Sequence, residues 1–338
     1  IKKMNNLILM TGTGSYLPKN KVSNNDLSKF VDTSDEWIKQ RSGIKFRHFV
    51  SKNEQTSDLA TEAAKRALDN TKLKSKDIDL IIVGTTTPDN TFPATAAKVQ
   101  KNLDSDAISF DIQAVCAGFV YALSVGVSML KDGYGSKCLI IGADSMSRIL
   151  DWQDRSTSVL FGDGAGAIIL EKFQIKANNP LDWGVLSNVI YTEGKHYDLL
   201  FTDGGVSLNK STGYIRMHGK EVFKHAVEKL SNSFVDALKK TNYKIEDVDW
   251  LIPHQANQRI INAVAEKLGF NKTKVVSTVS KHGNTSAASI PLALDYALKK
   301  NMIKNGEILG FQAIGGGLSW GSSIIKFGKP KNLLNICL

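Results

Sequence analysis

Two similar stretches of sequence, "KDIDLIIVGT" (residues 76–85) and "EDVDWLIPHQ" (residues 246–255), occur in the first and second halves of the chain. Each follows an amphipathic helical stretch of similar length, and each carries a short aliphatic run typical of a buried strand. Other aliphatic runs alternate with amphipathic helical stretches along the rest of the chain. Such an alternation is typical of a largely parallel sheet covered on both faces, so we expect an α/β fold.

The offset between these two stretches also relates two further pairs of segments. It aligns "CLIIGAD", which begins at Cys138, with "ILGFQAI", and it aligns Cys116 with Ser286. Three matches at one offset indicate an internal duplication. We therefore expect two halves of similar architecture, residues 1–174 and residues 175–338, with the functional residues between them.

The composition is that of an ordinary globular protein, with 338 residues, 42% of them apolar and 22% charged. The formal net charge is +10, from 43 basic and 33 acidic residues. Nucleic acid, an anionic membrane surface, an acidic protein or a phosphorylated ligand could each be the partner of a basic surface. Because the excess is mostly scattered lysine without a block of like charges, a solvated surface explains it equally well.

The three cysteines, Cys116, Cys138 and Cys337, form neither a CxxC pair nor an even-numbered framework. This argues against disulfides and a zinc site, and it predicts a reducing, cytoplasmic location. Two glycine-rich stretches, residues 11–18 and 161–169, lack the third glycine or the following helix of a nucleotide-binding loop. We interpret both as tight turns.

Residues 112–130 carry no charged side chain and approach the length that crosses a bilayer. The segment begins like a strand and contains Gln113, Gly118 and Gly126. We therefore interpret it as leading into a helix buried on all sides within the protein, and we expect no membrane insertion.

Three polar residues lie where a predicted strand passes into a helix: Cys116 in "AVCAGF", His254 in "LIPHQANQR" and Asn284 in "SKHGNTSAAS". A helix N-terminus lowers the pKa of a cysteine thiol, and the cysteine N–H can help to bind an oxyanion. Histidine can act at the carboxyl end of a strand, and an asparagine amide donates hydrogen bonds without titrating. Taken singly, the three also fit a core cysteine, a structural histidine and a helix cap. Together they indicate a nucleophilic site.

From about residue 8 to residue 327 the chain resembles the β-ketoacyl-acyl-carrier-protein synthase III family, the initiating condensing enzymes of bacterial fatty acid synthesis in the thiolase-like superfamily. The markers are "TSDEWIKQRSGI", "AVCAGF", "DRSTSVLFGDGAGA", "IPHQAN", "HGNTSAAS" and "GGGLSWGS". The resemblance implies a thiolase-like, duplicated αβαβα layered fold with two pseudo-equivalent halves. It also implies a homodimer.

The resemblance implies a two-step reaction. Cys116 would take an acyl group from an acyl-CoA, and malonyl-acyl-carrier protein would then lose CO₂ and attack the acyl-cysteine, giving 3-oxoacyl-carrier protein. His254 and Asn284 would donate hydrogen bonds to the malonyl thioester oxygen, and the N–H groups of Cys116 and Gly316 would form the oxyanion hole. No metal or redox cofactor is implied.

The residues that match the family's CoA entrance are Thr33, Trp37, Arg41, Arg155 and Asn257. Phe92 matches a residue that reaches into the acyl pocket of the other subunit, where a bulky side chain favours short primers such as acetyl. Carrier-protein contacts are expected at Gln255, Ala256, Asn257, Gln258, Arg259, Lys220, Lys224 and Lys267, because carrier proteins are acidic.

Three features depart from the family pattern. Lys220 stands where close relatives have asparagine, and Ile314 stands where phenylalanine is common. The tail that contains Cys337 runs past the usual end, and the sequence gives it no role. Primer length and branching and the natural carrier protein also stay open.

Several other functions fit part of the pattern. A condensing or acyl-transfer enzyme of secondary metabolism, or one with a branched or longer primer, would share the same fold. Thiolase itself needs a second catalytic cysteine, and only Cys337 lies late in the chain. A Cys-His-Asn acyl hydrolase would consume acyl donors without forming a carbon–carbon bond. A non-catalytic binding protein would not need all three polar residues.

Overall fold

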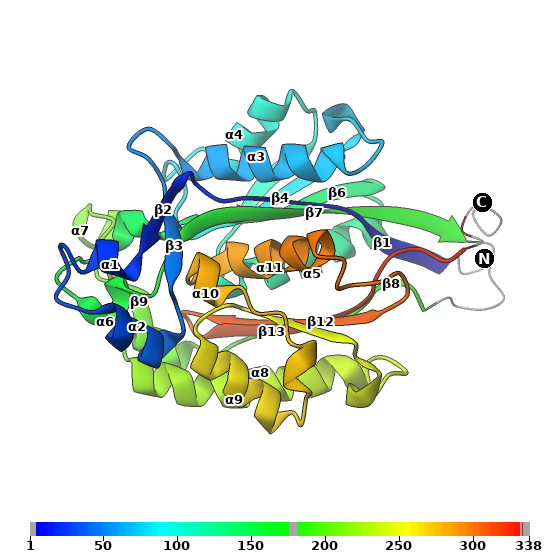
Figure 1. Ribbon diagram of the computed structural model, residues 1–338. Coiled ribbons are helices and arrows are strands. Elements are labelled where there is room, and N and C mark those ends of the chain that lie inside the picture. Colours follow the sequence, from blue (N-terminus) through cyan, green and yellow to red (C-terminus); the bar gives the residue numbers. More distant parts are fainter. Residues whose placement is uncertain (1–4, 176–181, 332, 334–338) are drawn as a thin grey trace.

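The computed structural model describes residues 5–175, 182–331 and 333, which form five stacked layers (Figure 1). Helices α3 and α4 cover one outer face, α5 and α11 lie in the middle, and α8 and α9 cover the opposite face. Two layers of strands separate the three layers of helices. This arrangement confirms the predicted αβαβα fold class.

The elements have the following bounds. The strands are β1 (Asn5–Tyr16), β2 (Asn20–Ser23), β3 (Phe46–Phe49), β4 (Leu80–Gly84), β5 (Ile108–Ile112), β6 (Lys137–Ser145), β7 (Asp163–Ile175), β8 (Gly184–Thr192), β9 (Leu200–Thr202), β10 (Ile215–Met217), β11 (Trp250–Pro253), β12 (Ile308–Gly315) and β13 (Ser319–Lys326). The α-helices are α1 (Asn24–Leu27), α2 (Asp35–Ser42), α3 (Thr56–Asp69), α4 (Thr95–Leu103), α5 (Gly118–Asp132), α6 (Arg155–Ser158), α7 (Val206–Asn209), α8 (Gly219–Lys239), α9 (Gln258–Lys267), α10 (Val279–His282) and α11 (Ser289–Lys299). Short 3-10 turns are η1 (Ser75–Asp77), η2 (Val115–Ala117), η3 (Met146–Ile149), η4 (Gly194–Leu199), η5 (Ile245–Asp247), η6 (Lys272–Lys274) and η7 (Ser286–Ala288).

The strand order repeats between the two halves. The nine strands follow the order β11-β12-β13-β8-β1-β7-β6-β4-β5. Strand β4 is parallel to β6, and β6 and β1 are each antiparallel to β7. In the same way β11 is parallel to β12, and β12 and β8 are each antiparallel to β13. The strands of the two halves are joined where β1 lies parallel to β8, at the register pair of Ile8 and Gly184. The predicted boundary after residue 174 falls at the end of β7.

The register of the repeat differs by one residue from the prediction. Leu80 of β4 pairs with Cys138, and Trp250, which the predicted offset matches to Leu80, pairs with Leu309. The same offset matches Cys138 to Ile308 instead, one residue before the observed partner. The chain between the paired positions of β11 and β12 is therefore one residue longer than the chain between those of β4 and β6.

The extra residue also affects the turns that begin the central helices. Turn η2 begins at Val115, which the predicted offset matches to Thr285, but turn η7 begins at Ser286. The alignment of Cys116 with Ser286 is therefore wrong by one position.

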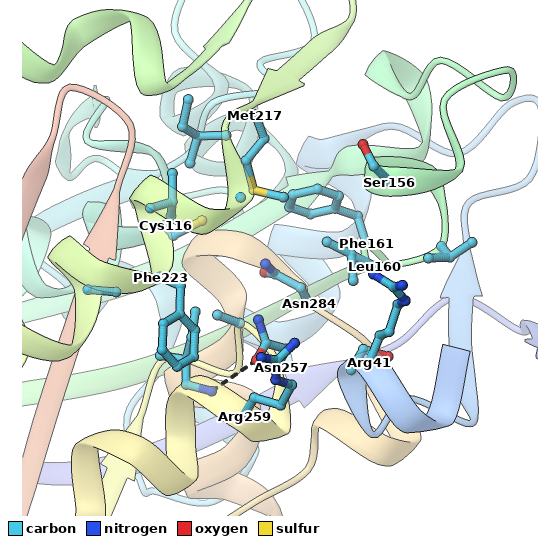
Figure 2. A pocket seen from close by; sticks show the side chains of 18 of the residues that line it. Arg41, Cys116, Ser156, Leu160, Phe161, Met217, Phe223, Asn257, Arg259 and Asn284 are labelled. Atoms are coloured by element: carbon cyan, nitrogen blue, oxygen red, sulfur yellow. Dashed lines mark hydrogen bonds between the residues drawn. The ribbon is translucent and has the colours of Figure 1, made fainter. Parts of the chain in front are cut away.

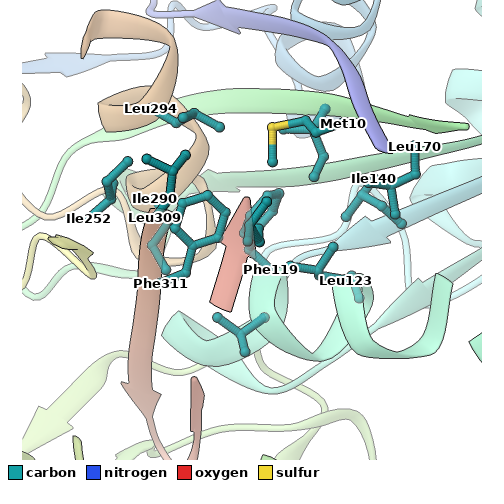
Figure 3. Packing of buried hydrophobic residues seen from close by; sticks show 14 of the residues in the cluster. Met10, Phe119, Leu123, Ile140, Leu170, Ile252, Ile290, Leu294, Leu309 and Phe311 are labelled. Atoms are coloured by element: carbon teal, nitrogen blue, oxygen red, sulfur yellow. The ribbon is translucent and has the colours of Figure 1, made fainter. Parts of the chain in front are cut away.

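Helix α5 lies in the middle layer, between the two layers of strands (Figure 1), and its side chains belong to the buried cluster of Figure 3. Its Phe119 and Leu123 are fully buried, and the Phe119 ring lies 6.4 Å from that of Phe311 on β12. By length and composition alone, residues 115–132 form a helix that could cross a membrane. The segment is therefore a core helix, but the prediction that it is buried on all sides is wrong, because one face, which carries Val125 and Ser128, is half-buried or exposed.

Two glycines bring the central helices against the ends of the strands. A Cβ atom on Gly142 of β6 would lie 2.2 Å from the carbonyl oxygen of Ala287, and one on Gly84 of β4 would lie 2.7 Å from the carbonyl carbon of Gly118. Real Cβ atoms do not approach that closely, so these positions require glycine. The close approach places η2 beside η7, and therefore places Cys116 next to the "HGNTSAAS" stretch.

Candidate active site

A cavity of about 560 Å³ runs inward from α2 to the start of α5. It is lined by eleven of the residues singled out in the sequence: Trp37, Arg41, Cys116, Arg155, Lys220, His254, Ala256, Asn257, Arg259, Asn284 and Ile314. Cys116 and Asn284 lie at its inner end and Arg41 at the opposite end (Figure 2). Residues from both halves of the chain thus meet in one cavity.

Cys116 occupies a strained turn between β5 and α5. The preceding residue, Val115, has φ of +48°, which is rare for a β-branched residue. Strand β12 passes close behind the turn, because a Cβ on Gly315 would lie 2.6 Å from the Cys116 nitrogen. The cysteine is 4% exposed, and burial raises the pKa of its thiol to about 12. Desolvation by burial is the largest cause of this rise, and the expected lowering of the pKa by the helix N-terminus stays a prediction.

His254 follows β11 and is buried. Its Nδ1 lies 2.7 Å from Ser289 Oγ, and that oxygen already accepts a hydrogen bond from the N–H of Gln255. The Ser289 hydroxyl can therefore donate to Nδ1, and we assign the ring hydrogen to Nε2 on that basis. Burial lowers the pKa of His254 to about 3, so the ring is neutral. A neutral ring with N–H on Nε2 is a hydrogen-bond donor.

Asn284 presents its amide nitrogen to the cavity. The side-chain oxygen accepts a hydrogen bond from the N–H of Ser286 at 2.9 Å. The backbone exchanges two hydrogen bonds with the chain at Leu160 and Gly162. Because the oxygen is engaged, the NH₂ group is the part available to a ligand.

Arg47 packs against the two segments that carry Gly162 and Gly283, and no sequence motif pointed to it. Its guanidinium is fully buried and donates to the carbonyl oxygen of Val159 at 2.8 Å and to Asn24 Oδ1 at 2.7 Å. A Cβ atom on Gly162 would lie 3.0 Å from the Cβ of Arg47, and one on Gly283 would lie 3.1 Å from it. The pattern of residue types around Arg47 gave no signal, because its partners lie far away in the sequence.

The outer end of the cavity carries a cationic aromatic platform. The guanidinium carbons of Arg41 and Arg155 lie 4.6 and 5.2 Å from the centre of the Trp37 ring. Thr33 does not line the cavity, but its buried hydroxyl has no hydrogen-bond partner. Asn257 caps α9 by accepting a hydrogen bond from the N–H of Ile260, which leaves its NH₂ group free at the cavity wall. Flat aromatic and guanidinium groups suit a planar base, and the positive charge suits phosphates.

A second cavity of about 480 Å³ lies on the other side of Cys116. Cys116 and Gly316 line it, together with apolar side chains such as Met146, Ile149 and Leu200. Its lining also includes polar residues such as Thr86, Gln113 and Ser319, so the cavity is only partly apolar. Phe92 does not line this cavity in the single chain and is 82% exposed.

One of the expected carrier-protein contacts does not fit the structure. Gln255 is 1% exposed, and its side chain makes hydrogen bonds to the backbone around Pro253, Val276 and Thr278, so it cannot meet a partner. Lys267 is exposed at the end of α9 and borders a different cavity, and its contact with a carrier protein stays a prediction. By contrast, Lys220 and Arg259 border the active-site cavity, and Lys224 and Gln258 lie on the same two helices.

Within the described residues, no group of three or more His, Cys, Asp or Glu side chains could hold a metal ion. The tail with Cys337 lies outside the described residues.

The duplicated five-layer fold and the Cys-His-Asn cavity between its halves are those of the thiolase-like condensing enzymes. Residues 110–194 match the family model described as 3-oxoacyl-[acyl-carrier-protein (ACP)] synthase III, and residues 238–327 match the model of its C-terminal part. The chain belongs to this family, and it is a condensing acyltransferase.

Individual relatives agree over almost the full length. A β-ketoacyl-[acyl-carrier-protein] synthase III of Dinoroseobacter shibae is 51% identical over 94% of this chain and 98% of its own. One of Wolbachia pipientis is also 51% identical, over 95% of this chain and 100% of its own. The crystal structure of 3-oxoacyl-[acyl-carrier-protein] synthase III from Aquifex aeolicus superposes with a TM-score of 0.88, at 45% identity over 95% of this chain and 100% of that one.

Proposed function

We propose that Cys116 accepts a short acyl group from acyl-CoA and that His254 and Asn284 then support decarboxylation of malonyl-carrier protein, so that 3-oxoacyl-carrier protein, CO₂ and CoA result. The observation that carries this proposal is the shared cavity, which has the thiol at one end and the Trp37 platform at the other. CoA fits this shape, with its adenine and phosphates on the platform and its thioester at Cys116.

The donor geometry supports the second step. His254 Nε2–H and the Asn284 NH₂ group are the two uncharged donors at the inner end of the cavity. Negative charge develops on the thioester oxygen when the malonyl group loses CO₂, and fixed donors in a buried site stabilise such charge. The N–H groups of Cys116 and Gly316 are proposed as the oxyanion hole for the attack on the acyl-cysteine.

The test is a condensation assay with acetyl-CoA and malonyl-carrier protein, in which acetoacetyl-carrier protein is detected by intact mass. We expect product from the native protein and none from Cys116→Ala. Cys138→Ala is the matched control, because Cys138 is also fully buried but lies in the core beside Gly126. Hydrolysis of acetyl-CoA without product would favour the acyl hydrolase. Acylation only by longer or branched acyl-CoA would favour a different primer.

We propose further that two copies form a homodimer in which Phe92 of each copy closes the acyl cavity of the other. The exposure of Phe92 and the apolar part of the lining of that cavity support this arrangement. A bulky aromatic ring there would limit the primer to a short acyl chain.

Lys220, Lys224 and Arg259 are proposed to attract an acidic carrier protein to the cavity mouth. The absence of a metal or redox cofactor, of nucleic acid and of membrane insertion stays a prediction, as does the cytoplasmic location.

A further inference from the structure

The segment that runs from Asn284 into η7 lies against β6, a strand of the other half of the chain. Asp144, near the end of β6, is fully buried, and its Oδ2 accepts a hydrogen bond from the N–H of Ala287 at 3.1 Å. A Cβ atom on Gly142, two residues earlier in the same strand, would lie 2.2 Å from the carbonyl oxygen of Ala287. Both polar groups of the Ala287 backbone therefore lie against β6.

Asp144 is itself held firmly by the first half of the chain. Its Oδ1 accepts four hydrogen bonds, from the hydroxyl groups of Thr85 and Thr87 and from the N–H groups of Thr86 and Thr87. Strand β6 also lies between β4 and β7 in the sheet, so its backbone is fixed on both sides. Because it is anchored in this way, the carboxylate is a rigid acceptor for the N–H of Ala287.

Ser286 connects this contact to Asn284, which lies at the inner end of the active-site cavity (Figure 2). The N–H of Ser286 donates to Asn284 Oδ1 at 2.9 Å and so leaves the NH₂ group to the cavity. The φ of Ser286 is +51°, in the left-handed region that a serine rarely adopts. Such a conformation persists only where the surroundings hold it, and here Asn284 and Asp144 bind the peptide groups on either side of it.

We propose that Asp144 is a positioning residue for decarboxylation: by holding the N–H of Ala287 it fixes the turn that orients the Asn284 amide. The inference rests on the proposed function, in which Asn284 donates to the malonyl thioester oxygen. In the part of the chain that the structure describes, Asp144 lines neither of the two cavities beside Cys116, so it acts through Asn284 and not on the substrate.

Two changes remove the contact between Asp144 and Ala287 from opposite sides. In Asp144→Asn, the four donors around the Oδ1 position keep the amide oxygen there, so the NH₂ group faces the N–H of Ala287. Two donors then oppose each other, and the contact is lost in a side chain of nearly the same shape. A backbone ester in place of the Ala287 amide lacks the N–H and leaves the carboxylate unchanged.

The test follows the two steps of the reaction separately. Intact mass measures acetylation of Cys116 by acetyl-CoA, and CO₂ release from malonyl-carrier protein measures decarboxylation by the acetylated enzyme. In both variants we expect kcat for CO₂ release to fall about 10- to 10²-fold while KM for malonyl-carrier protein stays near native, because Asn284 acts on charge that develops only in the transition state. Acetylation should not slow, since Asn284 is proposed to act only in the second step.

Two comparisons separate positioning from a general loss of stability. Thr85→Val removes a buried hydrogen bond to Asp144 but leaves the contact with Ala287, so it should lower the melting temperature without slowing CO₂ release. In an Asn284→Ala background, Asp144→Asn should change CO₂ release by less than about twofold, because the amide that it positions is absent. A purely structural role would slow both backgrounds equally.

The ester variant decides the question even if Asp144→Asn fails to fold. Slower CO₂ release with native acetylation supports the proposal. Native CO₂ release in the ester variant overturns it, as does a parallel loss of acetylation or an equal loss in the Asn284→Ala background. Failure of the proposed function gives a different result, because the native protein itself would then release no CO₂ or would not be acetylated at Cys116.

Discussion

At the scale of single residues, the site depends on which polar atoms are already engaged. Asn284 uses its oxygen to bind the N–H of Ser286, and His254 uses Nδ1 to bind Ser289. Each therefore offers one donor to the cavity and no free acceptor. A site of this kind stabilises a negative charge on a ligand but does not remove a proton from it.

Asn284→Asp tests the donor role, because the aspartate keeps the oxygen that binds Ser286 but offers no NH₂ group. We expect acylation of Cys116 to continue and decarboxylation of malonyl-carrier protein to slow by about 10²–10³-fold, since one donor is lost and a negative charge is added. Release of CO₂ and the mass of the acyl-enzyme measure the two steps. Asn284→Ala separates the charge from the lost donor. Unchanged decarboxylation in both variants would remove Asn284 from the second step.

His282 predicts a specific acid sensitivity. It is buried next to the catalytic loop, and burial, with His48 and Lys281 nearby, lowers its pKa to about 4. Between about pH 6.5 and pH 4 the unfolded chain binds a proton at this residue and the folded chain does not, so stability falls as the pH falls. His282→Phe keeps an aromatic ring against Tyr296 and removes the titration.

Urea unfolding at pH 6.5 and pH 5 measures this effect. The native protein should lose about 2 kcal/mol more than His282→Phe over this interval. The comparison cancels the contributions of other groups, including Asp163, whose pKa burial raises to about 6 and which acts in the opposite direction. Equal losses in the two proteins would show that His282 takes up its proton normally in the folded state.

At the scale of elements, the sequence predicted the strands, the central helix and the repeat because each is a local pattern. Cys116, His254 and Asn284 were predicted for the same reason, since each follows a strand in a short motif. Arg47 escaped notice because its partner Val159 lies 112 residues away. The one-residue error in the repeat came from an insertion that only strand pairing could locate.

Gly142→Ala tests whether the site depends on contact between β6 and η7. The added Cβ would lie 2.2 Å from the carbonyl oxygen of Ala287, so backbone must move. We expect a loss of about 1–3 kcal/mol in the free energy of unfolding, together with slower acylation, because η7 moves away from Cys116. Gly194→Ala is the matched control, since nothing lies within 4 Å of its Cβ position. Denaturation curves for both variants decide the point, and equal stability would show that η7 adapts freely.

At the scale of the whole molecule, the single chain leaves two features uncovered. Strand β5 ends the nine-stranded sheet, and its first residue, Ile108, is 51% exposed. The Phe92 side chain is 82% exposed. An open sheet edge and a large exposed aromatic side chain are surfaces that proteins usually cover. A second copy related by twofold symmetry would cover both with the same contact, since each copy presents the same edge.

Ile108→Lys therefore tests the proposed dimer. A charged side chain on an edge strand opposes pairing with another edge, so light scattering should give a mass near 37.0 kDa for the variant and about twice that for the native protein. Val235→Lys on α8 is the control, because Val235 is also exposed, at 40%, but lies on an outer helix away from β5. Cys116 and its cavity are untouched by either change.

If Phe92 closes the acyl cavity of the other copy, the monomeric variant should also accept longer acyl-CoA primers than the native dimer does. A dimeric Ile108→Lys protein, or a native monomer, would contradict the pairing through β5. A monomer with unchanged primer preference would separate dimer formation from the role of Phe92.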